Sequence, residues 1–333
     1  MNQHEIHRGK KKIRIGVMGC ASIAKRSMLP AILESDLFSL TVVASRSEEK
    51  ARDFGTAFAC ATCVGYDTLL ERDDIDAVYI PLPTGLHREW ITRALNAEKH
   101  VLAEKSIACT LTDAQEMVRL ASSRSLALME NYMFQYHPQH QIVQQWLAEK
   151  RIGELRLFRA DFGFPPLPED NFRYDDRIGG GALLDAAGYT VRALQFLLGD
   201  TFQVKAATLY PGPVGGTNRY GSAFLTNNAG TDAQLAFGMD HYYQCKYTLW
   251  GSKGKITSHW AFTPKPDSKP VLELETPEEK IMIEATPNNH FSGALTRFAE
   301  LIHHSSRKEM YDQILAQSLV LEDIRQHSKL NQH

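Results

Sequence analysis

The stretch GVMGCASIAKR, residues 16–26, decides the fold, because in it an apolar strand pattern gives way to a turn of small residues and then to a helical pattern. Glycine in such a turn lets backbone N–H groups approach a pyrophosphate at the N-terminus of the helix. Ala21 stands where a further glycine is usual, and its Cβ restricts φ without blocking that approach. We therefore expect a slightly altered turn that still binds a dinucleotide, with close helix–strand packing at the small Ala24.

Strand and helix patterns alternate through the first 130 residues. The strands are short runs rich in Val, Ile and Leu, as in a parallel sheet buried on both faces. Expected strands cover residues 12–18, 38–45, 75–83, 100–106 and 126–132, and expected helices cover residues 21–35, 47–54, 66–74, 84–98 and 110–124. This alternation predicts a doubly wound α/β domain with its ligand at the carboxyl ends of the strands.

The end of the second strand indicates which dinucleotide binds. An NAD site usually carries Asp or Glu there, bonded to the ribose 2′-OH. In this chain Ser45 takes that place and is followed by Arg46 and Ser47. A hydroxyl and a guanidinium suit a 2′-phosphate, which a carboxylate would repel. A solvated turn has the same composition, but the position favours NADP(H) over NAD.

After residue 130 the pattern changes to a helix and then to strands that alternate apolar and polar residues, which suits a sheet with one covered face. The helix is expected at 137–153, with Gly153 as its end. Strands are expected at 154–164, 203–211, 221–227, 232–240, 243–251 and 254–260, a surface loop at 264–270, and amphipathic helices at 290–304 and 309–328. We expect a dinucleotide-binding domain at 1–130, with a loose polar tail at 1–11, and a substrate and oligomerisation domain at 131–333.

One helical pattern interrupts these strands. Three glycines at 179–181 precede it, and Gly199 closes it. Asp185 and Tyr189 are four residues apart within it, so they share one helix face. The pair is either a surface hydrogen bond or a phenol oriented as a proton donor.

Composition excludes several classes of partner. The 333 residues carry 37 basic and 39 acidic side chains, which gives a formal net charge of −2. The chain therefore lacks the excess of basic residues that is typical of proteins that bind nucleic acid or an anionic membrane. No apolar run reaches the roughly 18 residues of a membrane span. Five cysteines, an odd number without a secretory signal pattern, indicate a reducing cytoplasm.

The cysteine and histidine spacings do not predict a metal site. Residues 60–63, CATC, form a single CxxC pair, and His137 and His140 flank Pro138 without an obvious third ligand. We expect CATC to be a short buried strand and turn, and we expect no metal.

The motifs GVMGCASIA, IPLPTGLH, VLAEKS, YMFQYHP and GGGALLDAAGY resemble those of the Gfo/Idh/MocA oxidoreductases, named for glucose–fructose oxidoreductase, inositol dehydrogenase and rhizopine catabolism, from about residue 12 to about residue 328. The resemblance implies a Rossmann domain plus a C-terminal α+β domain with a largely antiparallel open sheet. That sheet forms the substrate wall and often an oligomer interface. Within the family, GCASIAKRSMLPAI, NFRYDDRIGGGALLDAAGY and YTLWGSKGKI resemble the NADPH-dependent nucleotide-sugar 3-ketoreductases of deoxysugar biosynthesis.

The resemblance also implies roles for single residues. The family's Glu-Lys-Pro motif falls on Glu104, Lys105 and Ser106, and the serine in place of proline puts the local backbone in question more than the chemistry. Its Asp-x-x-x-His or Asp-x-x-x-Tyr motif falls on Asp185 and Tyr189, where tyrosine favours diol, aldose and sugar-keto reductases over inositol dehydrogenases. Residues expected at the cofactor are Gly19, Cys20, Ala21, Ser22, Ile23, Ser45, Arg46, Ser47, Pro81, Leu82, Thr84, His87, Glu104, Lys105 and Arg173.

Two of these cofactor residues have a second interpretation. His87 either lies beside the cofactor or is a structural cap. Arg173 either reaches the cofactor or a substrate phosphate, or it faces solvent.

Reduction of a ketone needs a hydride from the nicotinamide and a proton for the developing alkoxide. Tyr189 is the preferred donor, with a free pKa of about 10. The ammonium of Lys105 stabilises both the phenolate and the oxyanion, and Asp185 orients either group. In the alternative assignment Lys105 itself donates the proton.

The sequence therefore predicts a cytoplasmic enzyme that reduces a keto group on a nucleotide-linked deoxysugar with NADPH. One alternative is an NADP-dependent dehydrogenase of a free aldose or a trans-dihydrodiol. Another is a non-catalytic NADP-binding sensor, against which Lys105, Asp185 and Tyr189 argue because a sensor needs no proton donor. A homodimer or homotetramer is expected, since an open sheet with one uncovered face needs a partner.

Overall fold

The computed structural model describes residues 11–212, 216–303 and 307–330, so the tail expected at 1–11 lies almost wholly outside the described residues. The chain forms two compact units. The first comprises Met1–Ile107, Thr112–Asn131 and Phe291–Ile314, and the second comprises Ala108–Leu111, Tyr132–His290 and Leu315–His333. The first unit thus includes a segment, Phe291–Ile314, that the sequence analysis places in the second domain.

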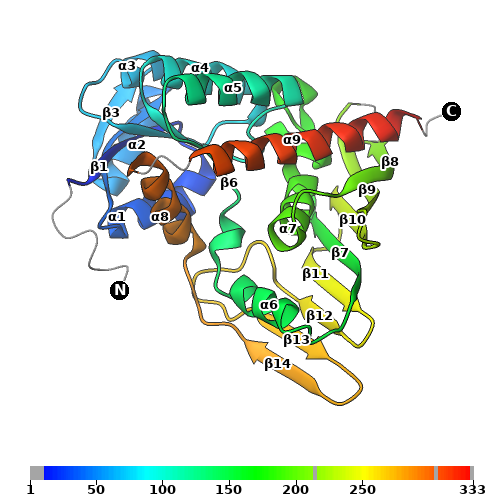
Figure 1. The fold of residues 1–333 in the computed structure, drawn as a ribbon. Helices are drawn as coiled ribbons and strands as arrows, with labels where there is room; N and C mark the ends of the chain where they lie inside the picture. The colour runs from blue at the N-terminus through cyan, green and yellow to red at the C-terminus, as the bar shows by residue number, and fades with distance from the viewer. Residues whose placement is uncertain (1–10, 213–215, 304–306, 331–333) are drawn as a thin grey trace. The chain divides into compact units, whose positions relative to one another are not determined.

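The first unit contains a six-stranded sheet, whose strands β1, β3 and β6 are labelled in Figure 1. The strands are parallel and have the order β3-β2-β1-β4-β5-β6. Its strands are β1 (Ile13–Met18), β2 (Phe38–Ser45), β3 (Ala61–Val64), β4 (Ala77–Ile80), β5 (His100–Glu104) and β6 (Leu128–Asn131). The strand order reverses between β1 and β4, and a ligand of such a sheet binds outside the carboxyl ends of the strands at that point. The doubly wound sheet predicted from the sequence is confirmed.

Helices connect these parallel strands, as the alternating pattern predicts. They are α1 (Leu29–Glu34), α2 (Glu48–Phe58), α3 (Tyr66–Leu70), α4 (His87–Asn96) and α5 (Leu111–Ser123). A later helix, α8 (His290–His303), follows β14 in the chain, and its residues from Phe291 onward belong to the first unit. A π-helical segment, Ala24–Met28, precedes α1, and a 3₁₀ turn, Thr84–Leu86, precedes α4. Ala24 is fully buried, which confirms the close packing expected at this small residue.

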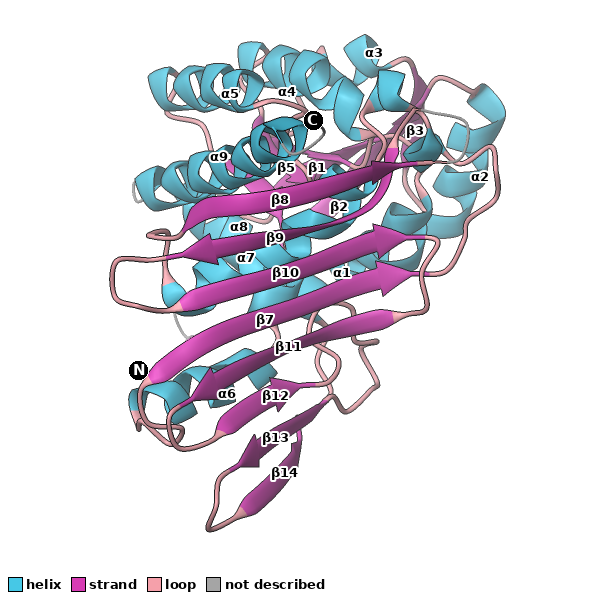
Figure 2. Ribbon diagram, turned by 90° about the vertical axis from the view of Figure 1, so that its right-hand side faces the viewer, coloured by secondary structure: helices cyan, strands magenta, loops and turns pink. Residues whose placement is uncertain are grey.

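The second unit contains an eight-stranded sheet in the order β14-β13-β12-β11-β7-β10-β9-β8, which faces the viewer in Figure 2. Its strands are β7 (Leu155–Phe164), β8 (Gln203–Pro211), β9 (Asn218–Thr226), β10 (Asp232–Met239), β11 (Gln244–Gly251), β12 (Lys255–Ser258), β13 (Val271–Glu275) and β14 (Lys280–Glu284). Neighbouring strands are antiparallel except for the parallel pair β7 and β10. The largely antiparallel sheet implied by the resemblance is therefore present.

Helical elements of this unit are α6 (Gln139–Ala148) and α7 (Gly188–Leu198), with short 3₁₀ turns at Met133–Tyr136, Phe172–Tyr174 and Asp176–Ile178. The long helix α9 (Arg307–Leu330) is divided between the units, with its residues up to Ile314 in the first and those from Leu315 in the second. A π-helical segment, Leu183–Ala187, leads directly into α7. This segment and α7 pack on β7 and β10, and they lie behind the sheet in Figure 2. Within the described residues, no helix is long and apolar enough to cross a bilayer.

Side-chain alternation gives the eight-stranded sheet two different faces. Phe158, Leu235 and Leu249 point toward the helices and are fully or almost fully buried. Their neighbours Arg159 and Gln234 point to the opposite face and are exposed. One covered face was predicted from the sequence, and the structure confirms it.

Three expectations about local structure are wrong. The helix expected at 137–153 ends at Ala148, and although Gly153 has a φ of +70°, it lies in the following turn. Ala61–Cys63 of the CATC segment lie in β3, but this strand is at the edge of its sheet and mostly exposed instead of buried. In addition, β13 and β14 were not predicted. Their sequences, VLELE and KIMIE, do show the alternation of a strand with one covered face.

Candidate active site

The glycine turn of the first unit lies at the switch point of its sheet. Gly19 has a φ of +116°, and a Cβ there would lie 2.9 Å from Cδ2 of Leu82 and 3.5 Å from Oη of Tyr66. Ala21 is not among the described residues with a positive φ, so the alanine causes no backbone strain. In this turn the positive φ falls on Gly19 and not on position 21. An alanine at position 21 is therefore tolerated.

The residues after this turn suit the phosphates of a dinucleotide. The helical stretch begins directly after Ala21, and the first N–H groups of a helix have no partner within it. Gly19 brings bare backbone to the same place. Cys20 points toward α2, because its Sγ donates to the carbonyl oxygen of Lys50 at 3.5 Å, and burial raises the pKa of its thiol. Backbone groups at 19–23, not the cysteine sulfur, therefore fit a pyrophosphate.

The end of β2 presents one guanidinium to solvent. Ser45 is buried, and its Oγ accepts from the backbone N–H of Ser47 at 3.2 Å. Ser47 in turn caps α2, since its Oγ accepts from the N–H of Lys50 at 3.3 Å. Arg46 between them is exposed. The two serines build the turn, and Arg46 is the group available to a 2′-phosphate.

The segment after β4 contributes a structural histidine. His87 is fully buried, with Nδ1 2.8 Å from the carbonyl oxygen of Ser106 and Nε2 2.8 Å from that of Leu82. Burial lowers the pKa of His87. The side chain thus joins two backbone segments at the carboxyl edge, as expected of a cap. Pro81 and Thr84 are buried beside it, and Leu82 covers Gly19.

Lys105 directly follows β5 and is partly exposed. The preceding Glu104 turns the other way, and its Oε1 accepts from Oη of Tyr79 and from Nδ2 of Asn131, each at 2.7 Å. Burial raises the pKa of Glu104. The peptide bond between Lys105 and Ser106 is cis. Two hydrogen bonds therefore hold the Glu104 carboxylate at the sheet edge, and Lys105 beside it is also partly exposed.

In the second unit, Asp185 is ion-paired and Tyr189 is buried. Nε of Arg173 donates to Oδ2 of Asp185 at 2.7 Å. Tyr189 is 6% exposed, and its ring packs on Phe162 at 4.7 Å and edge-on against Tyr132 at 5.6 Å. Its Oη lies 3.9 Å from Sδ of Met133. The phenol therefore sits in a fixed aromatic cage one turn after a paired carboxylate.

The loop that carries Arg173 closes tightly on itself. The carbonyl oxygen of Arg173 accepts from the N–H of Gly181 at 2.9 Å. A Cβ on Gly180 would lie 2.5 Å from that same oxygen and 2.8 Å from the carbonyl oxygen of Asp175. The glycine run at 179–181 thus permits the close approach that brings Arg173 to Asp185. From the sequence, Arg173 is expected to contact the cofactor or a substrate phosphate, or to face solvent. Its ion pair with Asp185 was not predicted.

Tyr66 lies at the same turn as Gly19, and the sequence analysis did not assign it. The available signal was its position, because only Gly65 separates Tyr66 from the end of β3 and the carboxyl ends of parallel strands share one edge.

The sequence predicts no metal site because its cysteine and histidine spacings offer too few ligands. Among the described residues, the structure has no group of three or more His, Cys, Asp or Glu that could hold a metal ion.

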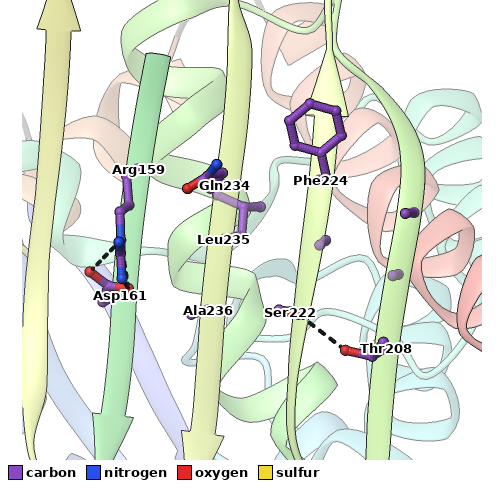
Figure 3. A pocket seen from close by; sticks show the side chains of 11 residues that line it. Arg159, Asp161, Thr208, Ser222, Phe224, Gln234, Leu235 and Ala236 are labelled. Carbon is purple, nitrogen blue, oxygen red and sulfur yellow. Dashed lines mark hydrogen bonds and ion pairs between the residues drawn. The ribbon is translucent and has the colours of Figure 1, made fainter.

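A concave pocket of about 380 Å³ lies on the exposed face of the eight-stranded sheet (Figure 3). Arg159, Asp161, Ser222, Phe224 and Gln234 are among its lining residues. Because side chains alternate, this is the face opposite to Phe162 and the Tyr189 cage. The pocket is therefore separate from Asp185 and Tyr189.

Two family domains match the chain. Residues 13–132 match the oxidoreductase family with an NAD-binding Rossmann fold, described as GFO_IDH_MocA, and residues 140–257 match the GFO/IDH/MocA C-terminal domain.

Similar curated proteins include two reductases. A dTDP-3,4-didehydro-2,6-dideoxy-alpha-D-glucose 3-reductase from Saccharopolyspora spinosa is 43% identical, over 87% of each chain. One of the same name from Streptomyces violaceoruber is 40% identical, over 96% of each chain. Among solved structures, KijD10, a 3-ketoreductase from Actinomadura kijaniata in complex with NADP and TDP-benzene, is 39% identical with a TM-score of 0.92, over 95% of this chain and 98% of that one.

Proposed function

Because this chain belongs to the Gfo/Idh/MocA family of oxidoreductases, we propose that it reduces the C3 keto group of a nucleotide-linked deoxysugar with NADPH. The observation that carries the proposal is the likeness to four reductases of one name, at 38–43% identity over at least 86% of this chain. A D-xylose 1-dehydrogenase among the relatives is 28% identical. The likeness therefore favours a nucleotide-linked substrate over a free sugar.

NADP(H) is the proposed cofactor, and when bound it supplies the hydride. The fit of this chain supports the proposal, since the bare turn at Gly19 and the following helix start suit a pyrophosphate. Arg46 is exposed and directly follows Ser45, which stands in the place where an NAD site carries a carboxylate. The solved complexes of KijD10 with NADP support the same choice.

For the proton we propose Tyr189 as the donor, with Lys105 as the alternative. The phenol is held in one orientation by Phe162 and Tyr132, so it can present its hydroxyl to a ketone without a search through rotamers. Asp185, fixed by Arg173, adds a negative charge one helical turn before it. Lys105 would stabilise the developing alkoxide as an ammonium.

We also propose that a second copy of the chain covers the exposed face of the eight-stranded sheet. This face carries aromatic side chains in water, with Trp250 60%, Tyr210 46% and Phe224 36% exposed. Tyr210 stacks on Tyr220 at 4.7 Å, which adds a flat aromatic surface beside the pocket. An exposed apolar area of this kind marks an association surface. The proposed assembly is therefore a homodimer or a homotetramer. We place it in the cytoplasm, in keeping with the five free cysteines.

The proposed activity is tested with a panel of substrates and each cofactor. The purified protein is mixed with NADPH or NADH and with a dTDP-linked 3-keto-2,6-dideoxysugar, and in the reverse direction with NADP⁺ and D-xylose or a trans-dihydrodiol. We expect turnover of the nucleotide-linked ketone with NADPH and little with the free substrates. Preferential oxidation of D-xylose or the diol would contradict the proposal.

A further inference from the structure

We infer that Tyr174 is a positioning residue for the proposed reduction, held in one cluster with Asp240 and Arg219. This Tyr174 cluster keeps the neighbouring Arg173 on Asp185. The inference rests on the proposed function and adds to it three side chains outside the expected site, all of them in the second unit. The end of β7, the end of β10 and the start of β9 share one edge of the sheet (Figure 2), because β7 and β10 are parallel and β9 runs the other way. Asp240 directly follows β10, and Arg219 is the second residue of β9.

The three side chains of the Tyr174 cluster contact one another. Oη of Tyr174 donates to Oδ1 of Asp240 at 2.6 Å. Nη1 of Arg219 donates to Oδ2 of the same carboxylate at 3.1 Å. Cζ of Arg219 also lies 3.8 Å from the centre of the Tyr174 ring, which is a cation–π contact. Each side chain is thus bound to the other two, so the ring is held both at its face and at its hydroxyl.

The same place on the sheet edge holds the start of the loop that leads to Tyr174. The hydroxyl oxygen of Tyr174 accepts from the backbone N–H of Leu167 at 2.9 Å. The N–H of His241, next to Asp240, donates to the carbonyl oxygen of Phe164 at 3.0 Å, at the end of β7. The loop therefore leaves the sheet and returns to it at one set of contacts.

The backbone accommodates this cluster at two positions. Asp240 has a φ of +60°, a left-handed conformation that aspartate and asparagine adopt more readily than most residues do. A Cβ on Gly212 would lie 2.7 Å from Nε of Arg219, so only glycine leaves room for the guanidinium where it lies. Both residue types therefore favour the arrangement that the three side chains adopt.

A short turn connects the Tyr174 ring to Arg173. The two residues are neighbours in the 3₁₀ turn Phe172–Tyr174, which begins after Asn171. Oδ1 of Asn171 accepts from the N–H of Arg173 at 3.1 Å, and Nε of Arg173 donates to Oδ2 of Asp185 at 2.7 Å. Because this turn fixes the backbone between the two side chains, holding the ring at the sheet edge also holds the guanidinium at the carboxylate.

The helical segment that carries Asp185 is held by the same strand. Oδ1 of Asn218, the residue before Arg219, accepts from the N–H of Leu183 at 2.7 Å. Leu183 begins the π-helical segment that contains Asp185. Asn218 therefore fixes the segment with the carboxylate, and Arg219 fixes the loop with the guanidinium. The start of β9 thus sets the geometry of the ion pair from both sides.

The role in the reaction is tested by kcat with NADPH and a dTDP-linked 3-keto-2,6-dideoxysugar. Tyr174→Phe removes both hydrogen bonds of the hydroxyl and should lower kcat about three- to tenfold, because a misplaced group loses part of its effect in the transition state. In a protein that already carries Arg173→Ala, the same substitution should change kcat less than about twofold, because Tyr174 acts through Arg173. A merely structural role would lower kcat by the same factor in both backgrounds.

Hydrogen exchange of the backbone amides tests the cluster without any substrate. Tyr174→Phe should speed exchange in the loop at residues 165–181 and leave exchange in α6 unchanged. This measurement does not depend on the proposed reaction, so it separates a failure of the cluster from a failure of the proposed function.

Tyr243→Phe is the matched control. Its hydroxyl also makes two hydrogen bonds, one with Oγ1 of Thr263 at 2.8 Å and one from Nε1 of Trp260 at 3.1 Å. Neither partner lies in the loop at residues 165–181. This variant should keep the wild-type kcat and the wild-type exchange of that loop, and melting temperatures check that each variant folds.

A conservative substitution of Asp240 provides a rescue. Asp240→Asn keeps an oxygen that can accept from Tyr174 and a residue that adopts the left-handed conformation, so it should retain most of the wild-type kcat. Asp240→Ala should lower kcat as Tyr174→Phe does. Unchanged loop exchange in Tyr174→Phe, or equal factors of kcat loss with and without Arg173, would overturn the inference. A wild type that does not reduce the keto-sugar would instead contradict the proposed function, and the exchange measurement alone would then decide whether Tyr174 holds the loop.

Discussion

Arg173 and Asp185 form an ion pair of 2.7 Å whose side chains are 30% and 15% exposed. A carboxylate this well buried costs free energy if its partner is removed. We expect Arg173→Ala to lower the melting temperature and kcat together, because Asp185 then loses the contact that fixes it. Arg177→Ala is the matched control. It lies in the same loop and pairs with Asp175 at 2.7 Å, but it is 88% exposed and should have little effect on either quantity.

A double-variant cycle shows whether the pair acts as a unit. Arg173→Ala combined with Asp185→Asn should be more stable than Arg173→Ala alone, because a neutral amide depends less than a buried carboxylate on the lost guanidinium. Independent, additive changes in melting temperature would show that the two side chains do not depend on each other.

The proton donor is tested by three substitutions assayed with NADPH and the keto-sugar. Tyr189→Phe removes only the hydroxyl, so its aromatic cage should persist while kcat falls by about 10²–10⁴. Lys105→Ala should be at least as damaging, and the two losses should be far from additive, because we propose that both residues serve the same proton transfer. Asp185→Asn should lower kcat by less than either of these two substitutions. Near wild-type kcat in Tyr189→Phe, with Lys105→Ala inactive, would make Lys105 or a bound water the donor.

Three buried histidines of the second unit predict loss of stability in mild acid. Burial lowers the pKa of His137 to about 4 and the pKa values of His140 and His290 to about 3. The unfolded chain binds these protons near pH 6.5, so stability is complete above that pH and falls as the pH drops toward the folded values. The loss is roughly 3 kcal/mol for His137 once the pH reaches 4.

Melting temperatures between pH 8 and pH 4.5 check this prediction. They should be constant at high pH and fall below about pH 6.5, and His290→Gln should make the fall shallower. His303→Gln, at an exposed position at the end of α8, should keep the wild-type slope. A melting temperature independent of pH over this range would show that these histidines are not buried in their neutral form.

Self-association is tested by light scattering at micromolar concentration. We expect a mass of two or four chains, and we expect Phe224→Glu to reduce it because a charge enters the aromatic face beside the pocket. Leu33→Glu, at an exposed apolar position of α1, should leave the mass unchanged. A monomeric wild type would contradict the proposed interface.

The fold was predictable because its signals are local. The strands Ile13–Met18 and Phe38–Ser45 are short apolar runs between helical patterns, and the turn at Gly19 needs a conformation that glycine adopts most readily. The edge strand Ala61–Val64 was misjudged, because an apolar run of four residues does not reveal whether it lies at the centre or the edge of a sheet.

The side-chain partners were less predictable, because they depend on contacts across the fold. Arg173 is twelve residues from Asp185, and only the tight turn at 179–181 brings them together. Tyr66 reaches the glycine turn through strand order, which periodicity does not give. Residue type and position at the carboxyl edge identified where the site lies, but not which side chains hold one another.

The most direct test of the proposed reaction traces the hydride from NADPH to the sugar. NADPH deuterated at C4, in the transferred position, is incubated with the protein and a dTDP-linked 3-keto-2,6-dideoxysugar, and the product is examined by NMR and mass spectrometry. The account predicts one deuterium at C3 of a sugar that is still linked to its nucleotide, and no such product with NADH at the same concentration. Deuterium at another carbon, or equal transfer from NADH, would contradict it.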